Sequence, residues 1–125
     1  MHLTAWITLA ALGLYAWTGT NVARARGAYK IKAPVMDGPL PFQSVLRVHA
    51  NTLEQLPLLL APLWMCAVFL GDSWAAAGGA LWCVGRIVYA LGYYKDPAKR
   101  EVGFIIGFTA SALLFLGTAV GLILH

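Results

Sequence analysis

Residues 102–124, VGFIIGFTASALLFLGTAVGLIL, form an apolar run without a single charged side chain. A helix needs about 20 mostly apolar residues to cross the hydrocarbon core of a bilayer, so this run is long enough. It lacks the strict alternation of polar and apolar residues that marks a strand of a membrane barrel. Because backbone polar groups find no water partners in lipid, the run predicts a transmembrane helix.

Three more segments have the same character. Residues 3–23 carry no charge, residues 55–71 follow a polar helical stretch that begins near residue 42, and residues 73–94 are interrupted only by Arg86. We therefore predict an all-α fold, an integral membrane four-helix bundle that forms one domain over residues 1–125. The expected helices cover about residues 3–24, 42–71, 73–95 and 98–124.

The composition supports a membrane protein and excludes other classes. Of the 125 residues, 60% are hydrophobic and 11% charged, whereas a soluble domain has about 25% charged residues. The net charge of +4 does not indicate nucleic acid, because the basic residues are few and flank apolar runs. Cys66 and Cys83 lie inside apolar runs, far from any metal-ligand cluster, and are expected to be packing residues.

The basic residues also predict the orientation. Most of the basic residues lie in the first connection, about residues 24–41, at the start of the second helix, and in the third connection, residues 95–100. The connection at residues 71–73 holds none. By the positive-inside rule, connections one and three should face the cytoplasm and both termini the opposite side. No charge precedes the first apolar run, so we interpret it as a retained helix and not a signal peptide. The compact chain, without a retention signal, favours a bacterial inner membrane. The basic residues concerned are Arg24, Arg26, Lys30, Lys32, Arg47, Lys95, Lys99 and Arg100.

The last helix carries two small-xxx-small pairs, Gly103 with Gly107 and Gly117 with Gly121. Such pairs let helix backbones approach closely in membranes. A bundle of four helices has little interior of its own, so we expect the chain to associate into an oligomer.

The stretch RVHANTLEQLP, residues 47–57, places Arg47, Asn51 and Glu54 at positions i, i+4 and i+7, which share one helix face. An Arg–Glu pair that anchors the helix at the interface would explain part of this pattern. Glu54, however, directly precedes a long uncharged run, and ionisable residues within spanning helices are functional candidates. His49 lies on a different face, as a surface residue would.

The stretch GRIVYALGYYKDPAKR, residues 85–100, places Arg86, Tyr89 and Tyr93 at i, i+3 and i+7, and Arg100 opens the last helix. Interfacial aromatic residues and snorkelling cations would explain each one singly. Taken with the second helix, they supply cations, one carboxylate, phenols and an amide at one membrane depth. This set suits a small ligand with carboxylates and an ammonium group. It suits neither a metal, which needs more ligands, nor Ser/His/Asp chemistry, which needs a nucleophile near His49.

These motifs resemble a known family. RVHANTLEQLP resembles the R-x-x-x-N-x-x-E-x-x-P signature of the MAPEG family, the membrane-associated proteins in eicosanoid and glutathione metabolism. GRIVYALGYY is similar to that family's R-x-x-Y-x-x-x-Y pattern. ARGAYKIKAP, residues 25–34, resembles the basic, proline-ended loop after its first helix. The resemblance covers almost the whole chain.

The resemblance implies a homotrimer with a glutathione site between neighbouring subunits. It implies detoxification by glutathione conjugation, or glutathione peroxidase activity, on lipophilic electrophiles in the membrane, with glutathione as co-substrate and no metal. Arg100 would be the catalytic residue that activates the thiol. Gln55 and Gly27 depart from the leukotriene-forming members, so a leukotriene role is not expected. The implied glutathione-binding residues are Arg26, Arg47, His49, Asn51, Glu54, Arg86, Tyr89 and Tyr93.

Two other functions fit a short four-helix membrane protein. The same family contains a non-catalytic lipid-binding scaffold, the five-lipoxygenase-activating protein, but the glutathione-binding set favours an enzyme. Small multidrug transporters depend on a glutamate within their first helix, and residues 3–23 carry no charge.

Overall fold

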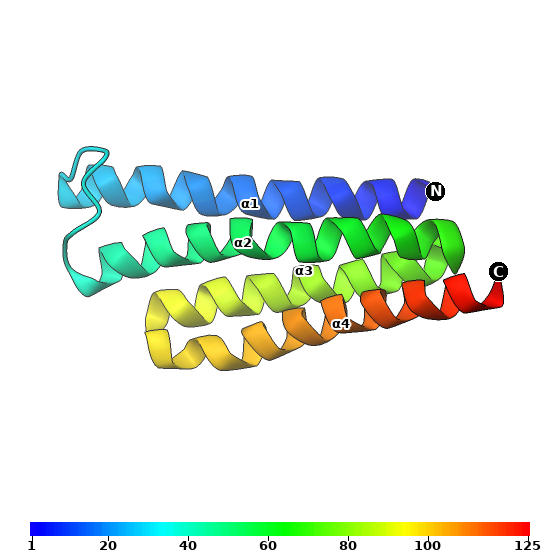
Figure 1. Ribbon diagram of the computed structural model, residues 1–125. Coiled ribbons are helices and arrows are strands. Elements are labelled where there is room, and N and C mark those ends of the chain that lie inside the picture. The colour runs from blue at the N-terminus through cyan, green and yellow to red at the C-terminus, as the bar shows by residue number, and fades with distance from the viewer.

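The computed structural model describes residues 1–125 as a bundle of long helices (Figure 1). The chain ends lie together at one end of the bundle, and the α1–α2 connection and η1 lie at the other. The all-α four-helix fold predicted from the sequence is therefore confirmed. The elements are α1 (His2–Tyr29), α2 (Leu40–Phe69), α3 (Asp72–Lys95), the short 3₁₀ helix η1 (Pro97–Arg100) and α4 (Glu101–Leu124).

The first connection is shorter than expected, because α1 continues past residue 24 to Tyr29 and α2 begins at Leu40. Lys30 ends α1 in the left-handed conformation, with φ 56°, and its N–H still donates to the Arg26 carbonyl. Pro39 precedes α2 with extended backbone. Proline is well tolerated at a helix start because the first N–H groups have no partner within the helix.

The α2–α3 turn holds the first turn of α1 in place. The Asp72 carboxylate accepts from the N–H groups of Leu3 and Thr4 at 3.2 and 2.9 Å, and from the Thr4 hydroxyl at 2.6 Å. Met1 at the N-cap makes no side-chain capping bond. Asp72 therefore supplies, from another helix, the cap that a Ser, Thr or Asp before the helix usually provides.

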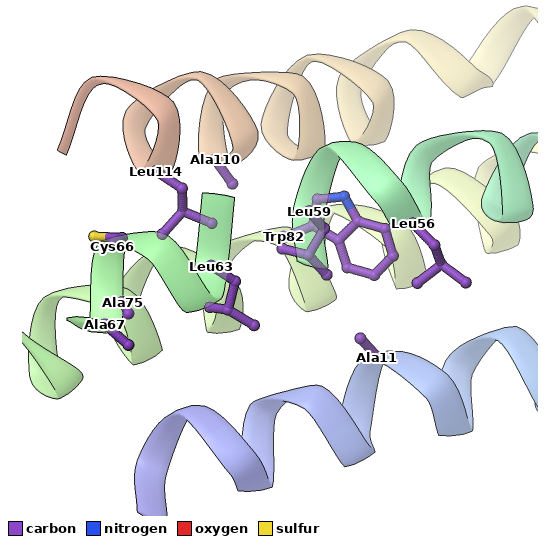
Figure 2. Close-up of a cluster of buried hydrophobic side chains, with 10 residues drawn as sticks. All are labelled: Ala11, Leu56, Leu59, Leu63, Cys66, Ala67, Ala75, Trp82, Ala110 and Leu114. Atoms are coloured by element: carbon purple, nitrogen blue, oxygen red, sulfur yellow. The ribbon is translucent and has the colours of Figure 1, made fainter. Parts of the chain in front are cut away.

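A core of small and branched apolar side chains joins all four helices (Figure 2). Trp82 of α3 is the largest fully buried side chain. The buried position of Cys66 confirms its predicted packing role, and Cys83 is partly buried beside this core. The core residues are Ala11, Leu56, Leu59, Leu63, Cys66, Ala67, Ala75, Trp82, Ala110 and Leu114.

The outer surface is strongly apolar, as a bilayer requires. Only 27 of the 125 residues are buried, and large apolar side chains such as Trp6, Phe115 and Ile123 are exposed. Three helices are long and apolar enough to cross a membrane: α2, α3, and α4 together with η1. The first helix, α1, is not among these three, so the predicted crossing by α1 stays a prediction.

Glycine brings the backbones of α3 and α4 into contact beside the polar end of the bundle. A Cβ built on Gly103 would overlap the backbone of Tyr89 and lie 2.7 Å from the Gly85 carbonyl oxygen. A Cβ on Gly85 would lie 2.6 Å from the Gly107 nitrogen. This close contact sets the position of Tyr89 relative to α4.

Candidate functional site

A polar cavity of about 350 Å³ opens between α2, α3 and α4. Its size falls within the range of about 300–1,000 Å³ that is usual for small-molecule sites. Five of the predicted site residues line it, and Glu101 and Phe104 of α4 complete the wall. The lining residues are Arg47, Asn51, Tyr89, Tyr93, Arg100, Glu101 and Phe104.

Glu101 and Phe104 were not among the predicted site residues. Phe104 follows Arg100 by four positions, so the two share a face of a continuous helix. Glu101 follows Arg100 directly. Arg47 and Asn51 were connected by a spacing of four residues. The same spacing, counted from Arg100 along α4, would have identified Phe104 from the sequence.

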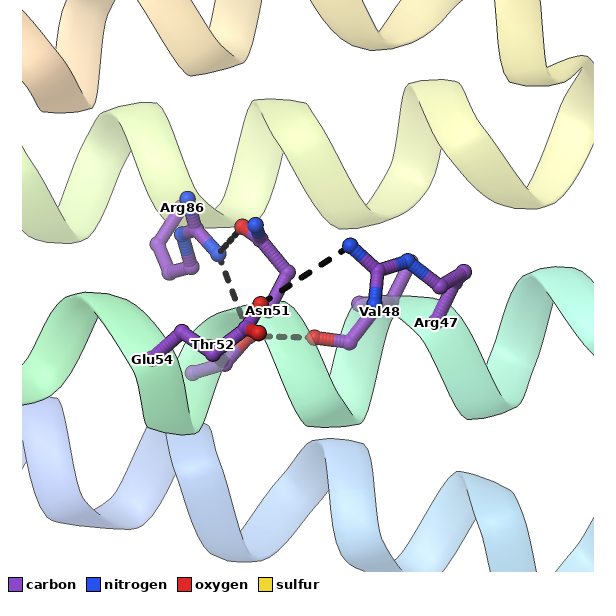
Figure 3. Close-up of polar contacts among 6 residues, drawn as sticks. All are labelled: Arg47, Val48, Asn51, Thr52, Glu54 and Arg86. Carbon is purple, nitrogen blue, oxygen red and sulfur yellow. Dashed lines mark hydrogen bonds and ion pairs between the residues drawn. The ribbon is translucent and has the colours of Figure 1, made fainter.

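Glu54 does not line the cavity. Its carboxylate lies 3.8 Å from the guanidinium of Arg47, and the side chains of Arg47 and Glu54 are 57% and 59% exposed (Figure 3). An exposed ion pair contributes at most about 1 kcal/mol, so it exchanges readily for a ligand. The pair therefore lies at the rim of the cavity, where Arg47 can contact either Glu54 or a ligand in the cavity.

Arg86 is buried behind the cavity wall, with 2% of its surface exposed. Its Nη1 donates to Oδ1 of Asn51 at 2.8 Å and to Oγ1 of Thr52 at 3.3 Å (Figure 3). The guanidinium also lies 4.2 Å from the ring centre of Tyr89. Arg86 was predicted to bind the ligand, but in this structure it contacts two residues that line the cavity and not the cavity itself.

The contact with Arg86 fixes the direction of the Asn51 amide. A guanidinium can only donate hydrogen bonds, so the Asn51 oxygen must face Arg86. The Asn51 NH₂ group is then the part left to donate into the cavity. Arg86 thereby makes Asn51 a hydrogen-bond donor toward a ligand.

We expect Arg86→Met to weaken binding of glutathione, the ligand that the resemblance implies, about tenfold, because the ligand would lose a well-directed hydrogen bond from Asn51, which contributes roughly 0.5–1.5 kcal/mol. Asn51 would lose its orientation while its side chain stays in place. Titration calorimetry on the detergent-purified protein measures the affinity. The matched control is Thr52→Val, which removes only the longer of the two Arg86 contacts. Equal weakening by both variants would contradict the role given to Asn51.

Arg100 stands where η1 meets α4. The Asp96 carboxylate accepts from the Ala98 N–H at 3.0 Å and caps η1. The Arg100 Nη1 donates to the Pro97 carbonyl at 2.7 Å, and its guanidinium lies 5.8 Å from the ring centre of Tyr93. These contacts with η1 and with the Tyr93 ring hold the Arg100 guanidinium along the cavity wall.

His49 is not brought to the cavity. Its ring stacks on Tyr15 of α1 with centroids 4.6 Å apart, and its Nδ1 lies 2.9 Å from the Thr18 hydroxyl. That hydroxyl donates its one proton to the Tyr15 carbonyl at 2.7 Å, so His49 Nδ1 must be the donor. The Nε2 atom then carries the free lone pair, on the α1 side of α2.

Arg26 also lies outside the cavity lining. Its Nη1 donates to the Val35 carbonyl at 2.7 Å, and its guanidinium lies 5.5 Å from the ring centre of Phe42. Within one chain, Arg26 therefore secures the α1–α2 connection.

The helices and the cavity define the class: an integral membrane bundle with a cationic, tyrosine-lined site at one end. The sequence profile of the MAPEG family matches residues 4–120. The chain belongs to this family of integral membrane proteins, and the resemblance found in its motifs is confirmed.

Individual relatives cover most of the chain. An uncharacterized protein of Synechocystis is 43% identical over 119 residues, which is 95% of this chain and 87% of the relative. Leukotriene C4 synthase of Mus musculus is 32% identical over 98% of this chain and 82% of its own length. Microsomal glutathione S-transferase 2 of Mus musculus is 35% identical over 80% of this chain and 66% of its own length.

Proposed function

We propose that this protein is a membrane-bound glutathione transferase that activates the glutathione thiol for attack on lipophilic electrophiles. The observation that carries the proposal is the cavity, where Arg47 and Arg100 approach a tyrosine pair and an oriented amide. The names of two relatives, a glutathione S-transferase and leukotriene C4 synthase, support the same chemistry. Peroxidase activity on lipid hydroperoxides would use the same activated thiol.

The mechanism begins with ionisation of the thiol. A free thiol has a pKa of about 8.5, so little thiolate exists at neutral pH. A neighbouring cation in a partly desolvated site favours the thiolate. Arg100 suits this role because it stays protonated and donates in a fixed fork. The thiol proton passes to solvent, and the sulfur then attacks the electrophile without a covalent enzyme intermediate.

The proposed assembly is a homotrimer with one site between each pair of subunits. Arg47 and Glu54 are more than half exposed in a single chain, although they lie on a membrane helix. A neighbouring copy would cover the side chains of Arg47 and Glu54, and its own Arg26 and His49 would then lie at the site. The proposed orientation places the α1–α2 connection and η1 in the cytoplasm of a bacterium.

The first test is an ultraviolet difference spectrum of glutathione added to the purified protein, read in the thiolate band at neutral pH. A saturable thiolate signal is expected. Binding without that signal would keep the site and reject the mechanism.

If glutathione does not bind, the lipid-binding scaffold becomes the better candidate. An apolar groove of about 390 Å³ between α2 and α4, lined by Pro57, Met65 and Phe115 among others, would then be the place to look for a bound lipid. A membrane transporter is not favoured, because α1 carries no acidic residue.

Glu54→Gln is expected to weaken glutathione binding about tenfold, because the glutathione ammonium would lose a charge-assisted contact at the rim. An analogue that lacks the amino group should lose little, and so serves as the control ligand. Calorimetric affinities of both ligands, for wild type and variant, give the comparison. Equal weakening of the two would remove Glu54 from ammonium recognition.

A further inference from the structure

Glu101 places an unpaired carboxylate in the cavity wall. The one ion pair in the structure joins Arg47 to Glu54, and Arg100 donates to the Pro97 carbonyl. Glu101 stands in the first turn of α4, where the helix dipole favours an anion. Its carboxylate is therefore favoured as a charge at the cavity, and it forms no ion pair with the two arginines that line the same wall.

A chain of aromatic rings leads from the cavity into the membrane span. The ring centres of Tyr93 and Tyr89 lie 5.6 Å apart, those of Tyr89 and Phe104 6.5 Å, and those of Phe104 and Phe108 6.1 Å. Phe108 is 57% exposed and lies within the apolar part of α4. A flat apolar molecule dissolved in the bilayer can follow these rings to the cavity.

The carboxylate stands beside this route. Glu101 precedes Phe104 by three positions and Phe108 by seven, so all three occupy one face of α4. An electrophile that reaches the cavity over Phe108 and Phe104 must come close to Glu101.

We infer that Glu101 makes this site select uncharged lipophilic electrophiles and reject those with a carboxylate near the reacting carbon. This inference rests on the proposed function and names its substrate class. Glutathione brings two carboxylates and a thiolate, whereas the cavity wall offers two guanidinium groups and the proposed neighbouring copy adds a third, that of its own Arg26. A further anion would be repelled by Glu101 and would find no cation left unpaired.

The test uses a matched pair of electrophiles, 4-chloro-3-nitrobenzoate and its methyl ester. In both, the glutathione sulfur forms a bond to the ring carbon, the carbon–chlorine bond breaks, and chloride leaves with its electron pair. The thiol proton has already passed to solvent. Dividing each enzymatic kcat/KM by the uncatalysed rate constant removes the difference in intrinsic reactivity.

Wild type is expected to prefer the ester, and Glu101→Gln is expected to raise the acid-to-ester ratio about tenfold, or about 1.4 kcal/mol. Added salt should raise the wild-type ratio and leave the variant's nearly constant, because salt screens exposed charges. Asp37→Asn, which removes an exposed carboxylate in the α1–α2 connection, is the control and should leave the ratio unchanged.

The inference would be overturned if neither Glu101→Gln nor added salt changed the acid-to-ester ratio. It would also be overturned if the enzyme formed the thiolate but did not conjugate the ester. The thiolate spectrum separates this failure from a failure of the proposed function. If wild type gives no thiolate signal, the proposed function falls and the inference falls with it. If the signal is present and the ratio does not move, only the role of Glu101 is wrong.

Discussion

Arg100→Ala is expected to bind glutathione but to lose its thiolate signal. With a pKa of about 8.5, only about 3% of a free thiol is ionised at pH 7. If the bound thiol is almost fully ionised in wild type, the variant should lose thiolate, and the rate of conjugation, about thirtyfold. Affinity should change less, because Arg47, Asn51 and the two tyrosines still line the cavity.

The thiolate band and calorimetry, measured on the same preparation, separate these two effects. Lys99→Ala is the matched control, because it removes the adjacent exposed cation, which does not line the cavity. Parallel loss of binding and thiolate in Arg100→Ala would show that Arg100 holds the ligand and does not activate its thiol. Raising the pH above the free thiol pKa should restore much of the variant's activity, because ionisation then needs no help.

Gly103→Ala is expected to produce the largest loss of stability of any single methyl group added to α4. The new Cβ would overlap the Tyr89 backbone, and backbone cannot swing aside as a side chain can. Overpacking of this kind costs about 1–3 kcal/mol or more. Because α3 and α4 must separate where Tyr89 enters the cavity, glutathione binding should fall along with the melting temperature in detergent.

Gly107→Ala is the matched control, one turn further along the same helix. A Cβ there would meet only Trp82, at 3.8 Å, which is an ordinary contact. The variant should keep wild-type stability and binding. Comparable losses from both substitutions would show that helix packing in solution differs from the close contact of Gly103 with Tyr89.

The helices were predictable because each is a long apolar run, and such runs have one stable form in lipid. Spacing predicted that Arg47 and Asn51 share a helix face, and likewise Tyr89 and Tyr93, because residues four apart on a helix lie on the same side. The combination of the two faces, with the family resemblance, indicated a site. Arg100 was selected by the resemblance. The cavity includes all five.

Features that depend on contacts between helices could not be predicted from spacing. Helical spacing places Arg86 on the same face as Tyr89, but only the packed helices show that Arg86 is buried and donates to Asn51. His49 is adjacent to the motif in sequence, yet it stacks on Tyr15 because α1 lies along that side of α2. The glycine pattern marked four candidate contacts on α4, and only the packed structure separates Gly103 from Gly107.

The contact between Asp72 and the first turn of α1 has a consequence for the order of biosynthesis. Asp72 follows Thr4 by 68 residues, so the N–H groups at the start of α1 have no protein partner until α2 has been made. Emergence of the α2–α3 turn from the ribosome supplies that partner. The cap on the first turn of α1 is thus completed only after α2 has been synthesised, although α1 and α2 can already pack against each other.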